Sequence, residues 1–178
     1  MYVPVMALTA DILTAARGLI AFTLIVSLAE RRLTTTAVLI SLAWLTDLLD
    51  GRAARAGSIE TRLGNWDLEV DTLVGASVLV GLQMGGAIPS WLMWGTLLLL
   101  GIPFLVVRRP TLAMALQAIA YASLLKLLWT EAGTARWLPP ITIAAILFID
   151  FERFRTITLP AFFSGFLELL PERGGEDQ

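Results

Sequence analysis

Six apolar runs of nearly membrane-spanning length follow one another along the chain. They cover residues 12–29, 33–49, 68–84, 88–107, 111–129 and 138–151. A helix that crosses a bilayer needs about 20 mostly apolar residues, within a range of about 17–25. Inside a bilayer the backbone must satisfy its own hydrogen bonds, which restricts single apolar segments to helices. The runs therefore predict an all-α, polytopic membrane protein with six transmembrane helices.

The composition supports the same class. The 178 residues are 57% hydrophobic and 16% charged, whereas soluble domains are about 45–50% apolar and about 25% charged. A net charge of −2 gives no broad basic surface for nucleic acid. We expect one membrane domain over residues 1–170 and a polar tail over 171–178. Whether residues 152–170 form an interfacial helix or a partial span is left open.

The basic residues predict the orientation in the membrane. With the amino terminus inside, nine of the 13 basic residues fall on the inner side and four on the outer side. The inner nine are Arg17, Arg52, Arg55, Arg62, Arg108, Arg109, Arg153, Arg155 and Arg173, and the outer four are Arg31, Arg32, Lys126 and Arg136. Cytoplasmic loops carry the excess of arginine and lysine. We therefore expect an inner-membrane (cytoplasmic-membrane) protein whose amino terminus lies in the cytoplasm.

Cysteine and histidine are both absent from the chain. This excludes disulfides, thiolate nucleophiles and most zinc sites. It also removes the side chain that most often serves as a general base near neutral pH. Acid–base or metal chemistry in this protein must therefore rest on carboxylates.

Four aspartates stand where the second apolar run ends and the third begins. Asp47 and Asp50 are three residues apart, and Asp67 and Asp71 are four apart. Residues at these spacings share one face of a helix. Glycines within 51–64 allow the two helices to return beside each other. The pattern predicts that four carboxylates converge at the cytoplasmic ends of two helices.

If no ligand is bound, the helix dipole accounts for the position of only one of these acids. The dipole favours Asp67 near a helix amino terminus but disfavours Asp47 and Asp50 at a carboxyl end, by about 0.3–1 kcal/mol each. Charges that border hydrocarbon are costly and usually functional. Clustered carboxylates without sulfur or imidazole ligands select Mg²⁺, Mn²⁺ or Ca²⁺. We interpret the aspartates as a divalent-metal site, and we expect Glu69, between Asp67 and Asp71, to face away from it.

The aspartate stretch resembles the signature of the CDP-alcohol phosphotransferase family, D-x2-D-G-x2-A-R-x8-G-x3-D-x3-D. The matching residues are Asp47, Asp50, Gly51, Ala54, Arg55, Gly64, Asp67 and Asp71. Leu13, Thr14 and Arg17 are similar to the first-span element of that family. Two residues separate Gly64 from Asp67 where the signature has three, and Leu68 and Thr72 replace residue types common in the family. The resemblance implies a membrane enzyme of six helices with its polar site at the cytoplasmic side.

The resemblance also implies a reaction. The donor would be a CDP-linked alcohol, most often CDP-diacylglycerol, and its phosphatidyl group would pass to the hydroxyl of a small alcohol as CMP leaves. Glycerol 3-phosphate is one candidate acceptor. Two Mg²⁺ or Mn²⁺ ions would be shared by Asp47, Asp50, Asp67 and Asp71, and Asp71 would also be the general base. We expect the enzyme to act in phospholipid synthesis as a homodimer.

Further roles follow from the same resemblance. The CDP group would be bound by Gly51, Ala54, Arg55 and Gly64. Arg17 lies inside the first span, where a charge without a function is rare. We therefore expect it to bind the phosphates or an aspartate. Arg108 and Arg109 are candidates for binding the acceptor or, equally, for anchoring the topology.

Two other functions stay open for the protein, namely a divalent-cation transporter or channel and a non-catalytic relative of the family.

Overall fold

A computed structural model of the chain describes residues 3–57, 66–153, 155, 156 and 160. For residues 3–11, 50–57, 67 and 153 it describes the backbone only. The described residues are helical and contain no strand. The helices are α1 (Val3–Ala29), α2 (Leu33–Gly57), α3 (Asp67–Met84), α4 (Ser90–Thr96), η2 (Leu97–Gly101), α5 (Ile102–Val107), α6 (Pro110–Glu131), η3 (Gly133–Trp137), α7 (Leu138–Ile149) and α8 (Phe151–Arg153). The predicted all-α class is confirmed.

Each predicted span coincides with a helix or a helical series. Among the described residues, three segments are long and apolar enough to cross a membrane, namely Ile12–Ala29, Ser90–Val107 and Pro110–Glu131. Leu33–Leu49 and Gly133–Ile149 are shorter apolar helices. The helix α3, which contains the third run, begins with three acids in its first five residues, and these lower its hydropathy. The number of spans and their orientation therefore remain predictions.

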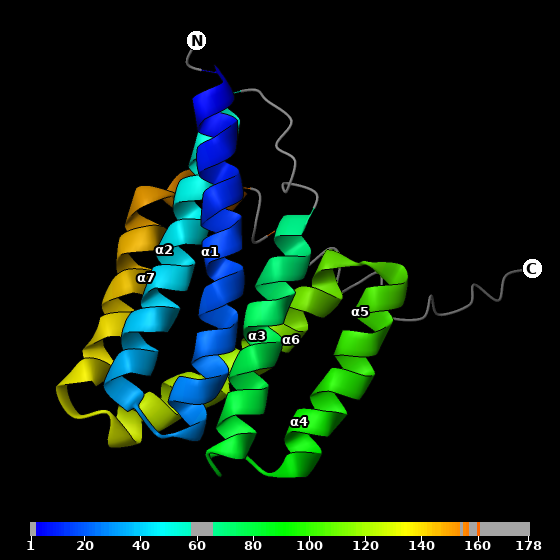
Figure 1. The fold of residues 1–178 in the computed structure, drawn as a ribbon, viewed down its shortest axis with the longest axis vertical. Coiled ribbons are helices and arrows are strands. Elements are labelled where there is room, and N and C mark those ends of the chain that lie inside the picture. Colours follow the sequence, from blue (N-terminus) through cyan, green and yellow to red (C-terminus); the bar gives the residue numbers. More distant parts are fainter. Residues whose placement is uncertain (1–2, 58–65, 154, 157–159, 161–178) are drawn as a thin grey trace, which may run out of the picture.

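The helices run alternately up and down, side by side (Figure 1). α1 descends from the amino terminus, α2 returns, and α3 descends again. The carboxyl end of α2 and the amino end of α3 consequently lie at the same end of the bundle as the start of α1 (Figure 1). α5 ends and α6 begins at that end too, at the break Arg108–Arg109. This arrangement brings the aspartates to one end, as the sequence predicted.

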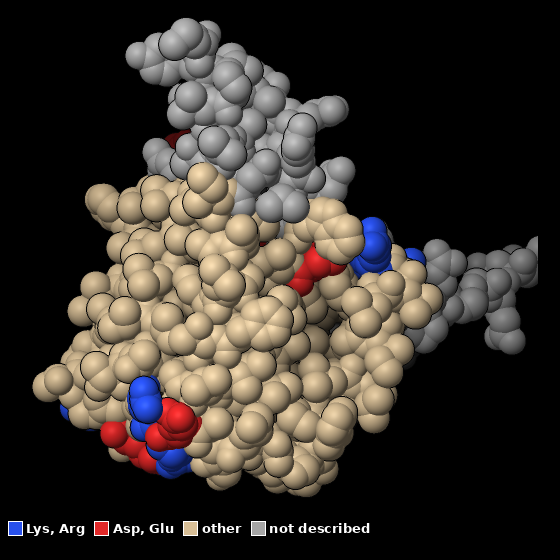
Figure 2. Space-filling view, in the orientation of Figure 1, with Lys and Arg blue, Asp and Glu red and all other residues tan. Residues whose placement is uncertain are grey.

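Most of the outer surface is apolar. Figure 2 shows one face that is nearly uncharged, with acidic and basic side chains confined to its lower corner and to its upper end. The exposed large side chains include Leu19, Phe22, Leu99, Leu105, Val106 and Phe148. A soluble monomer rarely exposes apolar surface this continuous, whereas a membrane protein presents it to lipid. The surface therefore agrees with the composition.

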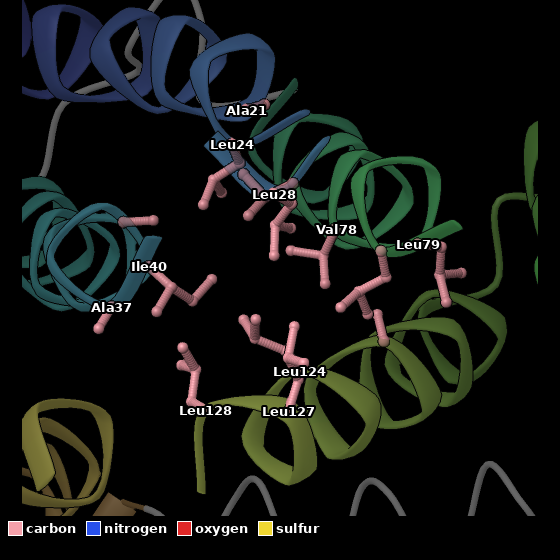
Figure 3. Packing of buried hydrophobic residues seen from close by; sticks show 14 of the residues in the cluster. Ala21, Leu24, Leu28, Ala37, Ile40, Val78, Leu79, Leu124, Leu127 and Leu128 are labelled. Carbon is pink, nitrogen blue, oxygen red and sulfur yellow. The ribbon is translucent and has the colours of Figure 1, made fainter. Parts of the chain in front are cut away.

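The core lies between α1, α2, α3 and α6 (Figure 3). Leu24 and Leu28 of α1 meet Ile40 of α2, Val78 and other residues of α3, and Leu124 of α6, and these side chains are fully buried or nearly so. α1 packs closely on α3. A Cβ at Gly81 would lie 2.8 Å from the Leu28 Cβ, and one at Gly85 would lie 2.4 Å from the Leu28 carbonyl oxygen. The two glycines therefore permit the helix approach on which the site below depends.

The fourth span is not one regular α-helix. Between α4 and α5 the backbone forms a π-helical turn, Leu97–Gly101, in which Ile102 N–H donates to the carbonyl of Leu97, five residues back. Pro103 follows directly. Proline has no N–H to donate and its ring disturbs the preceding turn, which accounts for the change of register. The continuous helix expected over 88–107 is therefore interrupted in the middle.

Candidate active site

Three helices contribute one charged side chain each to a polar cluster inside the bundle. Nη1 of Arg17 in α1 donates to Oδ1 of Asp47 in α2 at 2.6 Å, and also to Oδ1 of Asp71 in α3. Arg17 is 1% exposed, while Asp47 is 49% and Asp71 28% exposed. The guanidinium is therefore a buried cation that bridges two carboxylates from neighbouring helices.

The local sequence explains why these groups meet. Asp47 lies two residues before the end of the apolar segment Leu33–Leu49 of α2, and Asp71 lies one turn inside α3. α1 packs against both helices, and Arg17 extends its long side chain between them. A charge buried in apolar surroundings must be paired. Arg17 meets this demand through the aspartates, which is one of the two contacts expected for it.

A small cavity of about 60 Å³ adjoins the cluster. Besides the three charged residues it is lined by Ala43, Trp44, Val74, Gln117 and Tyr121. The rings of Trp44 and Tyr121 pack edge to face, with centroids 5.2 Å apart and an interplanar angle of 80°. Trp44, Gln117 and Tyr121 were not among the residues predicted for the site. The sequence could have identified Gln117, because an amide inside an apolar span usually faces the interior of the bundle.

The other metal-site candidates are placed only by their backbones. Asp50 lies one turn beyond Asp47 in α2, and Asp67 is the first residue of α3, one turn before Asp71. The side chains of Asp50 and Asp67 lie outside the described residues. The helix positions keep each aspartate pair on one face, in accordance with the three- and four-residue spacings.

The residues expected to bind CDP are placed in the same limited way. Gly51, Ala54 and Arg55 belong to the last two turns of α2, where only the backbone is described, and Gly64 lies outside the described residues. The helix α2 continues to Gly57, beyond the apolar run that ends at residue 49. This extension carries the three residues beyond the end of the apolar span, on the same helix as Asp47.

Arg108 and Arg109 lie at the break between α5 and α6. Arg108 ends α5 in a left-handed conformation, with φ 53°, and Arg109 precedes α6 with an extended backbone. Nη1 of Arg108 lies 3.6 Å from Oε1 of Glu69. Among the described residues, no contact joins either arginine to the aspartates, so the structure does not bring them into the cluster around Arg17.

The aspartates fit a divalent cation chemically. Among the side chains that the structure describes, no group of three or more acids, histidines or cysteines could hold a metal ion. Two carboxylate oxygens from different helices nevertheless converge on one positive atom, Nη1 of Arg17. An arrangement that concentrates negative charge on a single cation, and offers only oxygen ligands, suits Mg²⁺ or Mn²⁺.

Replacing Arg17 by methionine should destabilise the protein and make its stability depend on added metal. Removing one partner of a buried ion pair typically costs about 3–5 kcal/mol, and the half-exposed Asp47 favours the lower end, about 3 kcal/mol. We expect a lower Tm than that of the wild type in chelator, and a larger rise in Tm on addition of Mg²⁺, measured by thermal unfolding in detergent.

Arg31→Met is the matched control for this substitution. Arg31 also binds an acid, Glu131, and donates to the Gly85 carbonyl at 3.1 Å, but it is 38% exposed at the opposite end of the bundle. Its loss should lower the Tm less and add no response to Mg²⁺. An Arg17→Met variant as stable as the wild type in chelator would contradict the bridging role of Arg17.

Comparison with known protein families gives a match over most of the chain. A family model described as CDP-alcohol phosphatidyltransferase matches residues 7–151. The matched range includes every candidate site residue, from Arg17 in α1 to Arg109 before α6. No curated protein and no solved structure matches the chain.

Proposed function

The chain belongs to the CDP-alcohol phosphatidyltransferase family, and from this membership we propose that it transfers a phosphatidyl group from CDP-diacylglycerol to the hydroxyl of a small alcohol in phospholipid synthesis. The family consists of transferases that act on CDP-alcohols, and its membrane character agrees with the apolar helices of this chain. The identity of the donor lipid and of the acceptor, and the dependence on metal, are parts of the proposal.

The family match over residues 7–151 carries the proposal, and the convergence of Asp47 and Asp71 on Arg17 supports it. A CDP-linked donor brings a diphosphate to the site, and diphosphates are bound in proteins through cations. Asp47, Asp50, Asp67 and Asp71 would hold two Mg²⁺ or Mn²⁺ ions. When bound, these ions would neutralise the diphosphate and orient it for in-line attack.

Residues of the chain itself would transfer the proton and position the base. Asp71 would accept the proton of the acceptor hydroxyl, since the sequence contains no histidine for that role. The acceptor oxygen then forms a bond to the phosphorus that carries the diacylglycerol, the phosphorus–oxygen bond to CMP breaks, and CMP keeps the electron pair. Arg17 would hold the Asp71 carboxylate in place through their partly buried hydrogen bond.

Binding of the nucleotide and of the acceptor is assigned to the ends of the helices. Gly51 would allow close backbone approach, Ala54 would leave room for the cytidine, and Gly64 would belong to the same CDP-binding site. Arg55 would bind the nucleotide phosphate by charge-assisted hydrogen bonds. Arg108 and Arg109 are candidates for an acidic acceptor such as glycerol 3-phosphate. Their separation from the aspartate cluster leaves the topology-anchor role equally supported.

The setting of the reaction is also proposed. The bias of basic residues supports an inner-membrane location, with the amino terminus and the aspartates on the cytoplasmic side. A homodimer is proposed as the assembly. Family membership favours a transferase over the cation transporter, and the retained aspartates favour an active enzyme over a non-catalytic relative.

The direct test is release of CMP by purified protein in detergent. CDP-diacylglycerol is supplied with Mg²⁺ and with one acceptor at a time: glycerol 3-phosphate, inositol phosphate, serine or another small alcohol. We expect CMP to appear only with the true acceptor, together with one equivalent of a new phospholipid. Absence of CMP with every acceptor, from protein that remains monodisperse, would favour the non-catalytic relative.

A further inference from the structure

A cleft separate from the small cavity at Arg17 opens on the outer surface of the bundle. It has a volume of about 320 Å³ and lies between α3, the η2–α5 segment and α6. Its wall is almost wholly apolar and includes Leu73, Ala76, Gly101, Leu105 and Leu116. Figure 2 shows a hollow in this face below the charged side chains at its upper end. Its size and lining are those of a site that binds small apolar ligands.

One ionisable side chain lines this cleft. Glu69, at the first turn of α3, is 18% exposed. It lines a different cavity from Asp47 and Asp71, in accordance with its spacing from Asp71. Its Oε2 atom is buried and accepts no hydrogen bond from any residue that the structure describes. The hydroxyl of Thr72, also in the wall, already donates to the Leu68 carbonyl at 2.7 Å. A buried carboxylate oxygen requires a donor, and the ligand of the cleft is a natural source.

Arg108 supplies the opposite charge at the mouth. Its Nη1 lies 3.6 Å from Oε1 of Glu69, which is an ion pair too long for a hydrogen bond, and its side chain is 65% exposed. A guanidinium has five N–H donors, so most of its capacity remains for a phosphate. The mouth therefore presents one negative and one positive group side by side.

The depth of these groups matches that of a lipid headgroup. Glu69 is in the first turn of α3, and Arg108 directly follows the apolar span Ser90–Val107. With these helices across a bilayer, both charges would stand at the membrane surface, while Leu73, Ala76 and Leu105 line the cleft farther along the same helices. The π-helical turn contributes Leu97 and Gly101 to the deeper wall. A charged mouth above an apolar groove reproduces the polarity of a phospholipid.

From this arrangement we propose that the cleft binds a zwitterionic phospholipid whose headgroup carries a primary ammonium. The ammonium donates to Oε2 of Glu69, the phosphate accepts from Arg108, and one acyl chain lies in the groove. Each charge of the headgroup meets the opposite charge of the mouth. The anionic headgroup of phosphatidylglycerol brings the same phosphate but no ammonium to neutralise Glu69, and a trimethylated ammonium has no N–H to donate.

Native mass spectrometry of the protein in detergent tests this proposal independently of transferase activity. The protein is titrated separately with phosphatidylethanolamine, phosphatidylcholine and phosphatidylglycerol that carry identical acyl chains. We expect phosphatidylethanolamine to bind at least about tenfold more tightly than phosphatidylcholine, the factor expected for a hydrogen bond to a charged group. Glu69→Gln should remove most of this preference, and Ala76→Leu, which fills the groove, should weaken binding of all three lipids.

Glu30→Gln is the matched control, because Glu30 is an exposed acid outside the cleft, paired with Arg32. It should leave the preference unchanged. Equal binding of the ethanolamine and choline lipids, tightest binding of phosphatidylglycerol, or an unchanged preference in Glu69→Gln would overturn the proposal. It would also fall if CDP-diacylglycerol displaced phosphatidylethanolamine one for one, which would make the groove a donor site. A dimer that dissociates in Ala76→Leu, with no lipid bound to the wild type, would assign the groove to a second copy.

Discussion

Replacing Asp71 by asparagine is expected to slow CMP release at least about a hundredfold while leaving much of the affinity for the CDP-linked donor intact. Asparagine keeps the shape and the hydrogen-bonding capacity of the side chain but cannot accept the proton of the acceptor hydroxyl. General-base catalysis contributes about 10²–10⁴-fold to a rate. Turnover is measured as CMP release at saturating Mg²⁺, and donor affinity by titration in the absence of the acceptor.

Asp50→Asn provides the contrast that makes this result specific. Asp50 is proposed as a metal ligand without a role as the base, so its loss should weaken donor binding and be partly offset by higher Mg²⁺. Glu30→Gln applies the same acid-to-amide change at the opposite end of the bundle and should leave both quantities unchanged. Near-normal turnover of Asp71→Asn at saturating metal would remove Asp71 from the role of general base.

Removal of divalent metal should abolish CMP release altogether. The sequence offers no histidine or cysteine, and the proposed site consists of four carboxylates that must neutralise and orient a diphosphate. We expect EDTA to reduce CMP release to background, and Mg²⁺ or Mn²⁺ in excess of the chelator to restore it. The measurement is the initial rate over a series of free metal concentrations.

One control separates loss of metal from loss of the folded protein, and a second tests which metal geometry the site accepts. The Tm is recorded in the same chelator, because Arg17 bridges Asp47 and Asp71 and should keep the helices together without metal. Ca²⁺, a larger ion that accepts less regular geometry, tests whether the site demands the compact octahedral coordination of Mg²⁺. Full activity in EDTA from folded protein would exclude the proposed metal-dependent mechanism.

The sequence predicted the helices well because their signals are local. Apolar runs of spanning length and breaks at Gly85-Gly86 and Arg108-Arg109-Pro110 are properties of neighbouring residues, and the observed helices follow them. The interruption at Leu97–Gly101 was missed, although Pro103 was visible. A proline in an apolar span leaves several outcomes open, and the packing of neighbouring helices decides between them.

The candidate site was predictable in its chemistry and less so in its members. The absence of histidine and cysteine, together with the spacing of Asp47, Asp50, Asp67 and Asp71, directed attention to carboxylates from the residues alone. Trp44, Gln117 and Tyr121 were not identified. Gln117 and Tyr121 lie on α6, far along the chain from the aspartates, and no local pattern states which helix face meets the cluster.

By itself, the sequence determined which segments are helical, which side chains can perform chemistry, and which of them share a helix face, because these follow from hydropathy and from the helical period. Only the tertiary structure decided that Arg17 lies between Asp47 and Asp71, 30 and 54 residues away along the chain. It also decided that Glu69 lines an apolar cleft beside Arg108. Contacts of this kind depend on how closely helices approach, as at Gly81 and Gly85 against Leu28, and close packing is a property of the assembled bundle.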